Sequence, residues 1–263
     1  MTKTRTDYQV VPFPGARYAI LDYLHMAHRK HTIHGLIELD VTVPRQMIRE
    51  HKARAGESLS FTGFIIACLA HAVDENKAMH AYRQGNQLIL FDDVDVNTLI
   101  EHDVEGVKIA TPYVFRAANK KTFREIHQEL RAAQAHKARA PGGIRRYHWL
   151  PGPLRRLFWW AFGHYPHLKK RIGGTVSVTA LNMFGAGTGW AIPITDYTLG
   201  LALGGIAQKP GVADGRIAIR EILCLTLSVD HDVVDGAPAA RFVQRLKELV
   251  ESGYGLAEAG ASA

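Results

Sequence analysis

The segment from Cys224 to Phe242, CLTLSVDHDVVDGAPAARF, constrains the fold of this 263-residue chain more than any other. An apolar run, typical of a buried strand, leads into His231, and a helical pattern begins six residues later. Asp-Gly, at Asp235-Gly236, is a turn signal, so we expect the strand to end in a sharp loop that carries the side chains of both His231 and Asp235. A histidine exposed at the end of a buried strand can accept a proton at neutral pH. The segment therefore predicts a strand, a histidine-bearing loop and a closing helix.

Helical and strand-like patterns alternate along the rest of the chain. Helices are predicted over residues 16–31, 43–57, 58–77, 122–140 and 237–251, with Ser60 or Thr62 capping the third. Strands are predicted over 34–43, 105–115, 174–181, 198–206 and 215–230, and two more over 86–102 about Asp92-Asp93. The order shows no regular βαβ rhythm, no internal repeat and no Rossmann fingerprint. We therefore expect an α+β sandwich with a mixed sheet, consisting of an arm over residues 1–15 and a single domain over 16–263.

Composition limits the classes of protein to which the chain can belong. Lys and Arg outnumber Asp and Glu by 32 to 25, a net charge of +7. This excess favours a polyanionic ligand or an acidic partner, although a merely soluble basic surface fits it equally well. Cys68 and Cys224 lie in apolar runs and are expected to be reduced core residues. No apolar run is long enough to span a membrane and no signal peptide is evident, so we expect a cytoplasmic protein.

Residues 138–172 differ in composition from everything around them. This segment holds three of the four tryptophans of the chain, several prolines and many cations. Apolar aromatic side chains flanked by cations suit a partner contact, a membrane surface or a cap over a substrate. An insertion that packs against its own domain is equally compatible with the pattern.

Five segments together resemble a known family. Residues 230–236, DHDVVDG, and 237–242, APAARF, resemble the signature of the acyltransferase core of 2-oxo acid dehydrogenase complexes. GGTVSVTALNMFG, residues 173–185, is similar to the strand of that family that ends in a catalytic Ser or Thr. Residues 198–228 follow the hairpin and strand that lead into the motif, and residues 16–42 resemble the opening helix and strand. The resemblance covers most of the chain except the 138–172 insertion.

The resemblance implies a fold like that of chloramphenicol acetyltransferase, a trimer with active sites in channels between subunits. Coenzyme A would enter one end of the channel and the acyl acceptor the other. His231 would be the general base, and the Thr179 hydroxyl would stabilise the oxyanion of the tetrahedral intermediate. Asp235 and Gly236 would support the loop, with Arg17 as the candidate partner of Asp235. The homotrimers could assemble further into a larger cubic particle.

Three departures from the family pattern stand out. Asp232 replaces the usual Arg after the motif histidine, and Ala180 replaces the usual Asn after Thr179. The chain also opens directly into the catalytic region, without a lipoyl domain, a peripheral-subunit-binding domain or an Ala/Pro-rich linker. The lipoyl group is therefore expected on a separate protein. The alternatives are a coenzyme A-dependent acetyltransferase acting on a hydroxyl of a small molecule, and a non-catalytic assembly scaffold.

Other patterns give weaker signals. His25, His28, His31 and His34 recur every third residue, but no Cys or carboxylate accompanies them at ligand spacing, so no metal site is expected. GAGTG, residues 185–189, lacks the Lys and Ser/Thr of a phosphate-binding loop. The basic aromatic stretch could stack nucleic-acid bases, yet no nucleic-acid motif accompanies it. We therefore expect no nucleic-acid partner.

Overall fold

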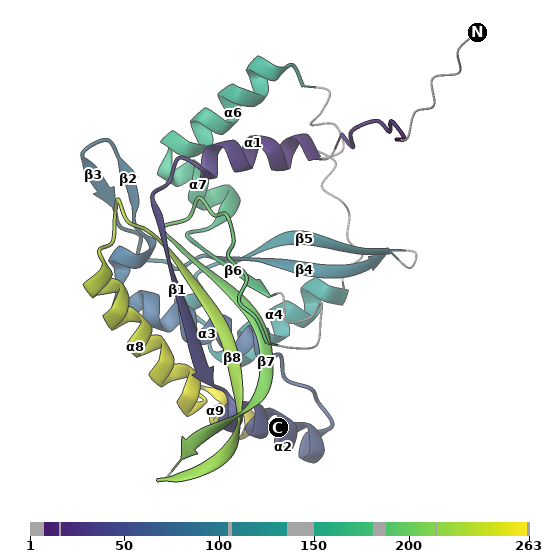
Figure 1. The fold of residues 1–263 in the computed structure, drawn as a ribbon, viewed down its shortest axis with the longest axis vertical. Helices are drawn as coiled ribbons and strands as arrows, with labels where there is room; N and C mark the ends of the chain where they lie inside the picture. Colours follow the sequence, from purple (N-terminus) through teal and green to yellow (C-terminus); the bar gives the residue numbers. More distant parts are fainter. Residues whose placement is uncertain are drawn as a thin grey trace.

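A six-stranded mixed sheet with helices on one face forms the body of the molecule (Figure 1). The computed structural model describes residues 8–15, 17–104, 107–135, 150–180, 188–213 and 215–261. The strands run in the order β1-β8-β7-β6-β4-β5, and β2 and β3 form a separate hairpin. Their bounds are β1 Thr32–Asp40, β2 Tyr82–Gln84, β3 Gln87–Ile89, β4 Val96–Val104, β5 Val107–Phe115, β6 Val176–Ala180, β7 Leu199–Ala213 and β8 Arg216–Asp230.

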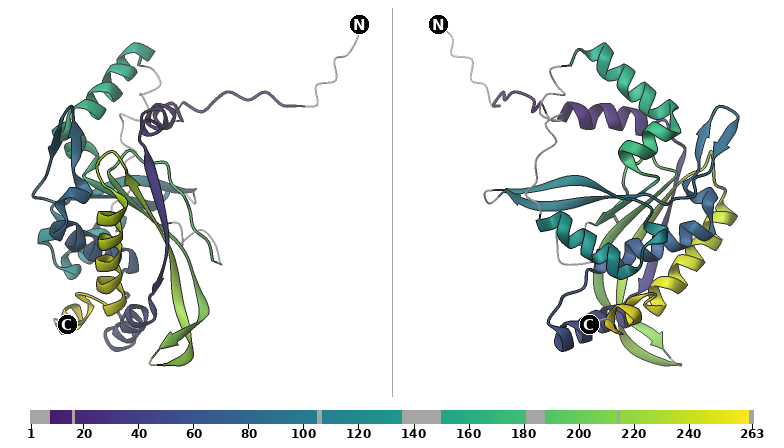
Figure 2. Two further views of the ribbon diagram at one scale, coloured as in Figure 1. Left: turned by 60° about the vertical axis from the view of Figure 1, so that its left-hand side comes forward. Right: turned by 180° about the vertical axis from the view of Figure 1, so that it is seen from behind.

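The helices pack mainly as one layer beside the sheet, as the edge-on view in Figure 2 shows. Their bounds are α1 Arg17–Ala27, α2 Thr42–Ala55, α3 Phe61–Glu75, α4 Phe123–Ala135, α6 Gly152–His164, α7 Pro166–Gly173, α8 Gly236–Ser252 and α9 Leu256–Ala261, with short 3-10 helices η1 Lys77–His80 and η2 Ala118–Lys120. The prediction of an α+β two-layer fold with a mixed sheet is confirmed. Of the two strands predicted over 86–102, the first contains β3 and the second overlaps β4, whereas strand β2 and helices α6, α7 and α9 were not predicted.

Helix α3 is the centre of the helical layer because its sequence is apolar on nearly every side. All residues from Gly63 to Ala70 are buried, and α3 contacts both α4 and α8. A helix that is apolar all round must lie between other layers rather than at the surface. The Ser60 side chain accepts a hydrogen bond from the Gly63 amide at 3.1 Å. Of the two predicted caps, Ser60 is therefore the one used.

Strand β8 lies between β1 and β7 and is antiparallel to both. β6 is parallel to β7 and to β4, which makes the sheet mixed. The β7–β8 register shifts between Leu203 and Ile206. There the chain passes so close that a side chain on Gly204 would lie 2.1 Å from the Gly189 carbonyl oxygen. Of the GAGTG stretch, only its last two residues lie within the described part of the chain.

Strand β8 ends at Asp230 in the predicted sharp loop. The chain turns over residues 231–233, because the amides of Val233 and Val234 both donate to the Asp230 carbonyl oxygen at 3.1 Å. Asp235 is in extended conformation and Gly236 is already the first residue of α8. An added Cβ on Gly236 would meet nothing within 4 Å. The predicted loop at the end of the strand, which carries His231 and Asp235, is therefore present, and its turn precedes the Asp-Gly pair. Gly236 meets no steric requirement among the described residues.

The described part of the 138–172 segment folds into α6 and α7, which lie next to α1 (Figure 1). Trp159 meets Tyr23 of α1 edge to face, with ring centroids 5.9 Å apart. Residues 138–149 lie outside the described chain. Within the part that is described, the segment packs against its own domain. Of the predicted arm, residues 8–14 are exposed.

The two cysteines confirm the expectation of reduced core residues. Cys68 and Cys224 are both free and fully buried. Burial raises the pKa of the Cys68 thiol far above its usual value, so it does not ionise at neutral pH. In the described ranges, no helix combines the length and apolar character needed to cross a membrane.

One buried histidine makes the stability of the fold depend on pH. His80 is fully buried and its Nδ1 lies 3.0 Å from Thr175 Oγ1. Burial lowers the pKa of His80 from 6.5 to about 4. Between these values the unfolded chain binds a proton that the folded chain does not, so the unfolding free energy falls as the pH is lowered. We expect His80 to account for about 1.6 kcal/mol of the loss of unfolding free energy between pH 6.5 and 5.

Urea unfolding of wild type and His80→Asn at both pH values measures this contribution. The variant should lose less unfolding free energy on acidification than wild type does, by about 1.6 kcal/mol. His28→Asn is the matched control because His28 is exposed, and it should behave like wild type. An equal loss of unfolding free energy on acidification in wild type and His80→Asn would show that His80 does not cause the pH dependence.

Candidate active site

His231 stands at the point where β8 ends. Its backbone amide donates to the His31 carbonyl oxygen at 2.8 Å, which extends the β1–β8 ladder by one bond. The imidazole is 44% exposed, and its Nδ1 lies 3.6 Å from Asp235 Oδ1. A carboxylate beside Nδ1 favours the tautomer that carries its proton there, which leaves Nε2 to accept a proton. The predicted His231–Asp235 proximity is therefore present, at a distance longer than a hydrogen bond.

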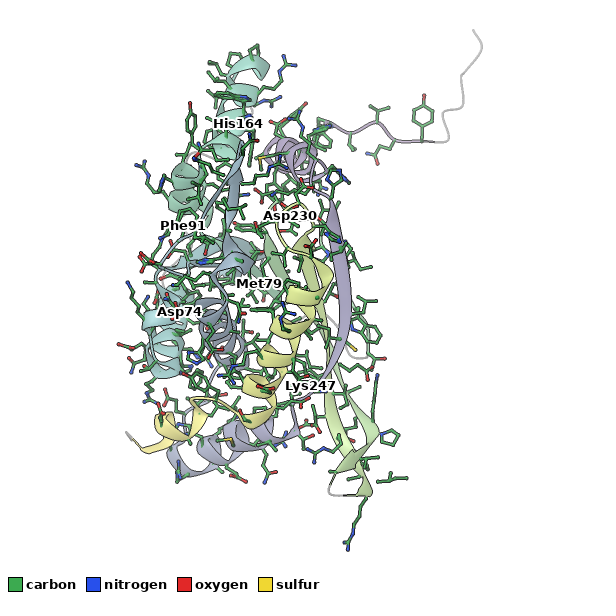
Figure 3. The ribbon with its side chains drawn as sticks, turned by 90° about the vertical axis from the view of Figure 1, so that its left-hand side faces the viewer. Asp74, Met79, Phe91, His164, Asp230 and Lys247 are labelled. Atoms are coloured by element: carbon green, nitrogen blue, oxygen red, sulfur yellow. The ribbon has the colours of Figure 1, made fainter. Side chains whose placement is uncertain are left out.

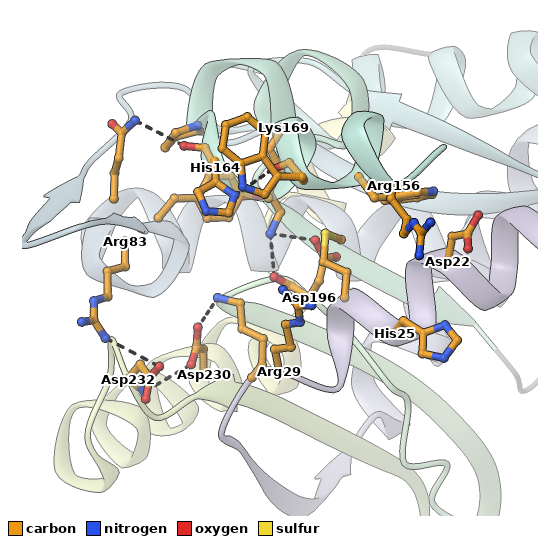
Figure 4. A pocket seen from close by; sticks show the side chains of 18 of the residues that line it. Asp22, His25, Arg29, Arg83, Arg156, His164, Lys169, Asp196, Asp230 and Asp232 are labelled. Atoms are coloured by element: carbon orange, nitrogen blue, oxygen red, sulfur yellow. Dashed lines mark hydrogen bonds and ion pairs between the residues drawn. The ribbon is translucent and has the colours of Figure 1, made fainter. Parts of the chain in front are cut away.

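Asp230, the residue before His231, stabilises the turn through its buried carboxylate. Asp230 has a buried side chain that forms an ion pair with Lys30, and its Oδ1 accepts a hydrogen bond from the Asp232 amide at 3.2 Å. A buried carboxylate is stable only when it is paired and hydrogen-bonded in this way. Asp230 therefore ties the turn to the end of α1 (Figure 4).

Asp232, the charge reversal noted in the sequence, has cationic partners on two other elements. Its Oδ1 lies 2.8 Å from His31 Nδ1, and its Oδ2 lies 3.8 Å from a guanidinium nitrogen of Arg83 in β2. The hydrogen bond from His31 lowers the pKa of the Asp232 carboxyl. His31 therefore holds the loop twice, through its carbonyl oxygen to His231 and through its ring to Asp232. The replacement of the family's usual Arg by Asp232 indicated that the contacts of this loop differ, but nothing in the sequence identified His31 and Arg83 as the partners.

Thr179 lies on the same sheet but away from His231. It is half-buried on β6 and pairs with Ala202 of β7, which in turn pairs with Thr226 of β8. His231 follows Thr226 by five residues, roughly 16 Å along the strand at about 3.3 Å per residue. A single chain therefore does not bring the predicted base and oxyanion donor together.

The predicted Arg17–Asp235 contact is not formed within the described chain. Arg17 is the first residue of α1 and its side chain is exposed, whereas Asp235 faces His231. The pairing stays a prediction.

The four regularly spaced histidines do not share one helix face, because α1 ends at Ala27. His25 is on the helix, His28 in the following turn, and His34 on β1 with its Nδ1 2.9 Å from Ser228 Oγ. Among the residues described, no group of three or more His, Cys, Asp or Glu side chains is arranged to hold a metal ion.

A family model for the 2-oxoacid dehydrogenases acyltransferase (catalytic domain) matches residues 5–141 and 167–257. The chain belongs to this family. The match omits residues 142–166, which include all of α6. The family resemblance inferred from the histidine motif is therefore confirmed, and the insertion over 138–172 stays a prediction.

Curated relatives and solved structures agree with the family. The chain is 27% identical over 218 residues to the dihydrolipoyllysine-residue succinyltransferase component of 2-oxoglutarate dehydrogenase complex of Bartonella vinsonii, covering 81% of this chain and 46% of the relative. It is 27% identical over 250 residues to the lipoamide acyltransferase component of the branched-chain alpha-keto acid dehydrogenase complex of Bacillus subtilis, covering 92% and 52%. The chain spans about half the length of these relatives.

Two solved structures show that the fold is shared. A probable dihydrolipoamide acetyltransferase from Listeria monocytogenes superposes with a TM-score of 0.69 at 22% identity, covering 94% of this chain and 96% of that one. A chloramphenicol acetyltransferase superposes with a TM-score of 0.51 at 15% identity, covering 92% and 99%. The fold expected from the family is thereby confirmed.

The contacts of Asp232 predict how firmly the loop is held. Asp232→Ala removes the acceptor of His31, so the loop should open more often and the His231 amide should exchange its hydrogen faster. The pair is partly exposed, which limits the expected increase to about threefold. Hydrogen exchange followed by NMR measures it. Glu50→Ala, on the exposed side of α2, is the control and should leave the exchange rate of the His231 amide unchanged. Equal exchange rates in Asp232→Ala and wild type would show that the His31–Asp232 contact does not hold the loop.

Proposed function

We propose that this protein is an acyltransferase that moves an acyl group between coenzyme A and a thiol acceptor. The observation that carries the proposal is the half-exposed imidazole of His231 at the end of β8, with Asp235 beside Nδ1, inside a motif of this family. A neutral imidazole with a free ring nitrogen can accept a proton from a thiol and so act as a general base.

The proposed reaction needs one proton to move twice. His231 Nε2 removes the proton from the acceptor thiol, and the sulfur attacks the carbonyl carbon of the acyl thioester. The carbonyl oxygen of the tetrahedral intermediate then carries the negative charge, and a hydroxyl hydrogen bond stabilises it. When the intermediate collapses, the carbon–sulfur bond to coenzyme A breaks and the leaving thiolate takes the proton back from His231. The acyl group ends on the acceptor sulfur, and coenzyme A leaves as the free thiol.

Thr179 is the proposed donor of that hydrogen bond. Its distance from His231 within one chain determines whether the two residues can act in the same site. Thr226, level with Thr179 across the sheet, precedes His231 by five residues, so the two groups require a second copy of the chain to meet. We therefore propose a homotrimer in which Thr179 of one copy faces His231 of the next. Assembly of such trimers into a larger cubic particle is part of the same proposal.

The proposed acceptor is a dihydrolipoyl group carried by a separate protein, with coenzyme A as the other substrate. The net charge of +7 suits a polyanionic substrate such as coenzyme A and an acidic carrier domain. A cytoplasmic location stays a prediction.

His231→Ala tests the base directly. The assay measures the release of free coenzyme A from acetyl-CoA in the presence of dihydrolipoamide. Loss of a general base lowers kcat by about 10² to 10⁴-fold, so the variant should be nearly inactive. His28→Ala serves as the control because His28 is exposed in the turn after α1. Undiminished turnover in His231→Ala would remove the proposed role.

Thr179 and the shared site are tested together by mixing inactive variants. Thr179→Val should lower kcat by about 10² to 10³-fold, and Thr179→Ser should restore most of it. When His231→Ala and Thr179→Val are co-expressed, mixed trimers form in which some interfaces combine an intact His231 with an intact Thr179. About a quarter of all sites should be of this kind, so about a quarter of the wild-type activity should return. Mixed trimers without regained activity would mean that base and donor come from the same chain.

A further inference from the structure

A second feature of the molecule lies behind the catalytic loop. A half-open cavity of about 1090 Å³ is lined by residues of α1, β2, α6, α7 and the end of β8 (Figure 4). Asp230 and Asp232, the two neighbours of His231, line it, whereas His231 does not. Figure 3 shows Asp230 and His164 at the same end of the molecule, with Lys247 toward the other. The volume is at the upper end of the range for small-molecule sites.

One wall of this cavity is α6, the helix that the family model leaves out. Trp159, Trp160 and His164 of α6 line it. The Trp160 and His164 rings stack with centroids 4.5 Å apart, and His164 Nδ1 lies 2.8 Å from the Trp160 carbonyl oxygen. These contacts hold a flat aromatic surface at the cavity. This wall lies outside the residues that the family model matches, whereas nearly all of the other lining residues of the cavity lie within them.

The floor of the cavity is electrically balanced. Lys169 is buried, its Nζ lies 2.8 Å from an Asp196 carboxylate oxygen, and it donates to the Asp196 carbonyl oxygen at 2.6 Å. Burial lowers the pKa of Lys169, and the Asp196 carboxylate opposes that effect. The second buried carboxylate, Asp230, is paired with Lys30. The charges on the floor are therefore compensated by the protein itself.

The two remaining acidic side chains are paired as well. Asp22 Oδ2 lies 3.5 Å from Arg155 Nε, and Asp232 lies 2.8 Å from His31 Nδ1 and 3.8 Å from Arg83. Every carboxylate that lines the cavity thus has a cationic or imidazole partner within 4 Å. An entering anion would meet no uncompensated negative charge.

Two of the arginines that line the cavity have no acidic partner among the described residues. Arg29 follows α1 and Arg156 lies on α6, so they reach the cavity from two different walls. Both are exposed, and their guanidinium groups have no hydrogen-bond or ion-pair partner among the described residues. Arginine presents a planar fork of donors that matches carboxylate and phosphate groups. The cavity therefore offers two unused anion-binding groups beside an aromatic surface.

We infer that this cavity is a binding site for an organic anion, whose carboxylate or phosphate is held by Arg29 and Arg156 and whose flat apolar body lies against Trp160. The inference does not depend on acyl transfer, because it concerns a cavity that His231 does not line. Two sources share this chemistry: a small aromatic or unsaturated acid, and the phosphates and adenine of coenzyme A.

Isothermal titration calorimetry with two matched probes tests the site. Naphthalene-2-carboxylate has the required flat body and charge, and naphthalene-2-carboxamide has the same body without the charge. The carboxylate should bind about tenfold more tightly than the carboxamide, because only it forms charge-assisted hydrogen bonds. Arg29→Gln and Arg156→Gln should each weaken the carboxylate by about tenfold and leave the carboxamide unchanged.

Arg216→Gln is the matched control, because Arg216 is an exposed arginine at the opposite end of β8 and does not line the cavity. It should bind both probes as wild type does, and all three variants should keep the wild-type melting temperature. Equal binding of the two probes, no binding of the carboxylate, or an equal loss in Arg216→Gln would overturn the inference.

Repeating the titration with coenzyme A present separates the two sources. Displacement of the carboxylate identifies coenzyme A as an occupant, and undisturbed binding identifies a separate acid; both results support an anion site. Because binding is measured without turnover, an inactive protein that still binds the carboxylate would contradict the proposed function and leave the anion site standing.

Discussion

The position of β8 between β1 and β7 determines where the chemistry of this molecule can occur. The pairs Thr32–Asp230 and Leu199–Val229 fix the end of β8, and the bond from the His231 amide to His31 continues the same ladder. A slip of one residue in this register would turn every side chain of β8 to the other face of the sheet. The exposed imidazole therefore depends on a long strand whose last eight residues are all buried.

The same register separates His231 from Thr179. Because β6 is two strands away from β8 and Thr179 is level with Thr226, no small side-chain movement brings the hydroxyl to the imidazole. The sheet thus separates the proposed base from the proposed oxyanion donor within one chain. Symmetry is the simple means of joining them, because each copy then supplies one half to a neighbour.

Strong local patterns made much of the fold predictable. The apolar run before His231, the helix after Asp235 and the Ser60 cap follow from periodicity and capping rules, and the structure contains all three. The exact turn was not predictable, because Asp235-Gly236 opens a helix as readily as it forms a turn. The three-residue strands of the β2–β3 hairpin are too short to show alternation, and α6 has no clear polar face.

Contacts between distant segments were beyond the reach of sequence reasoning. Asp232 drew attention as a charge reversal, yet its partners His31 and Arg83 lie some 200 and 150 residues away along the chain. The carboxylates of Asp230 and Asp232 contact the loop that carries His231 and also line the cavity behind it. Helix α6 therefore lies next to the groups that hold the loop carrying His231, and this arrangement follows only from the packing of α1, α6 and α7.

Size-exclusion chromatography with light scattering, with acyl transfer assayed in every fraction, tests the central claim that the site is shared between copies. The chain has a mass of 29.1 kDa. The account predicts that activity elutes only with particles of three chains or a multiple of three, and that dilution into monomers abolishes it. Full activity in a fraction of single chains would contradict the account.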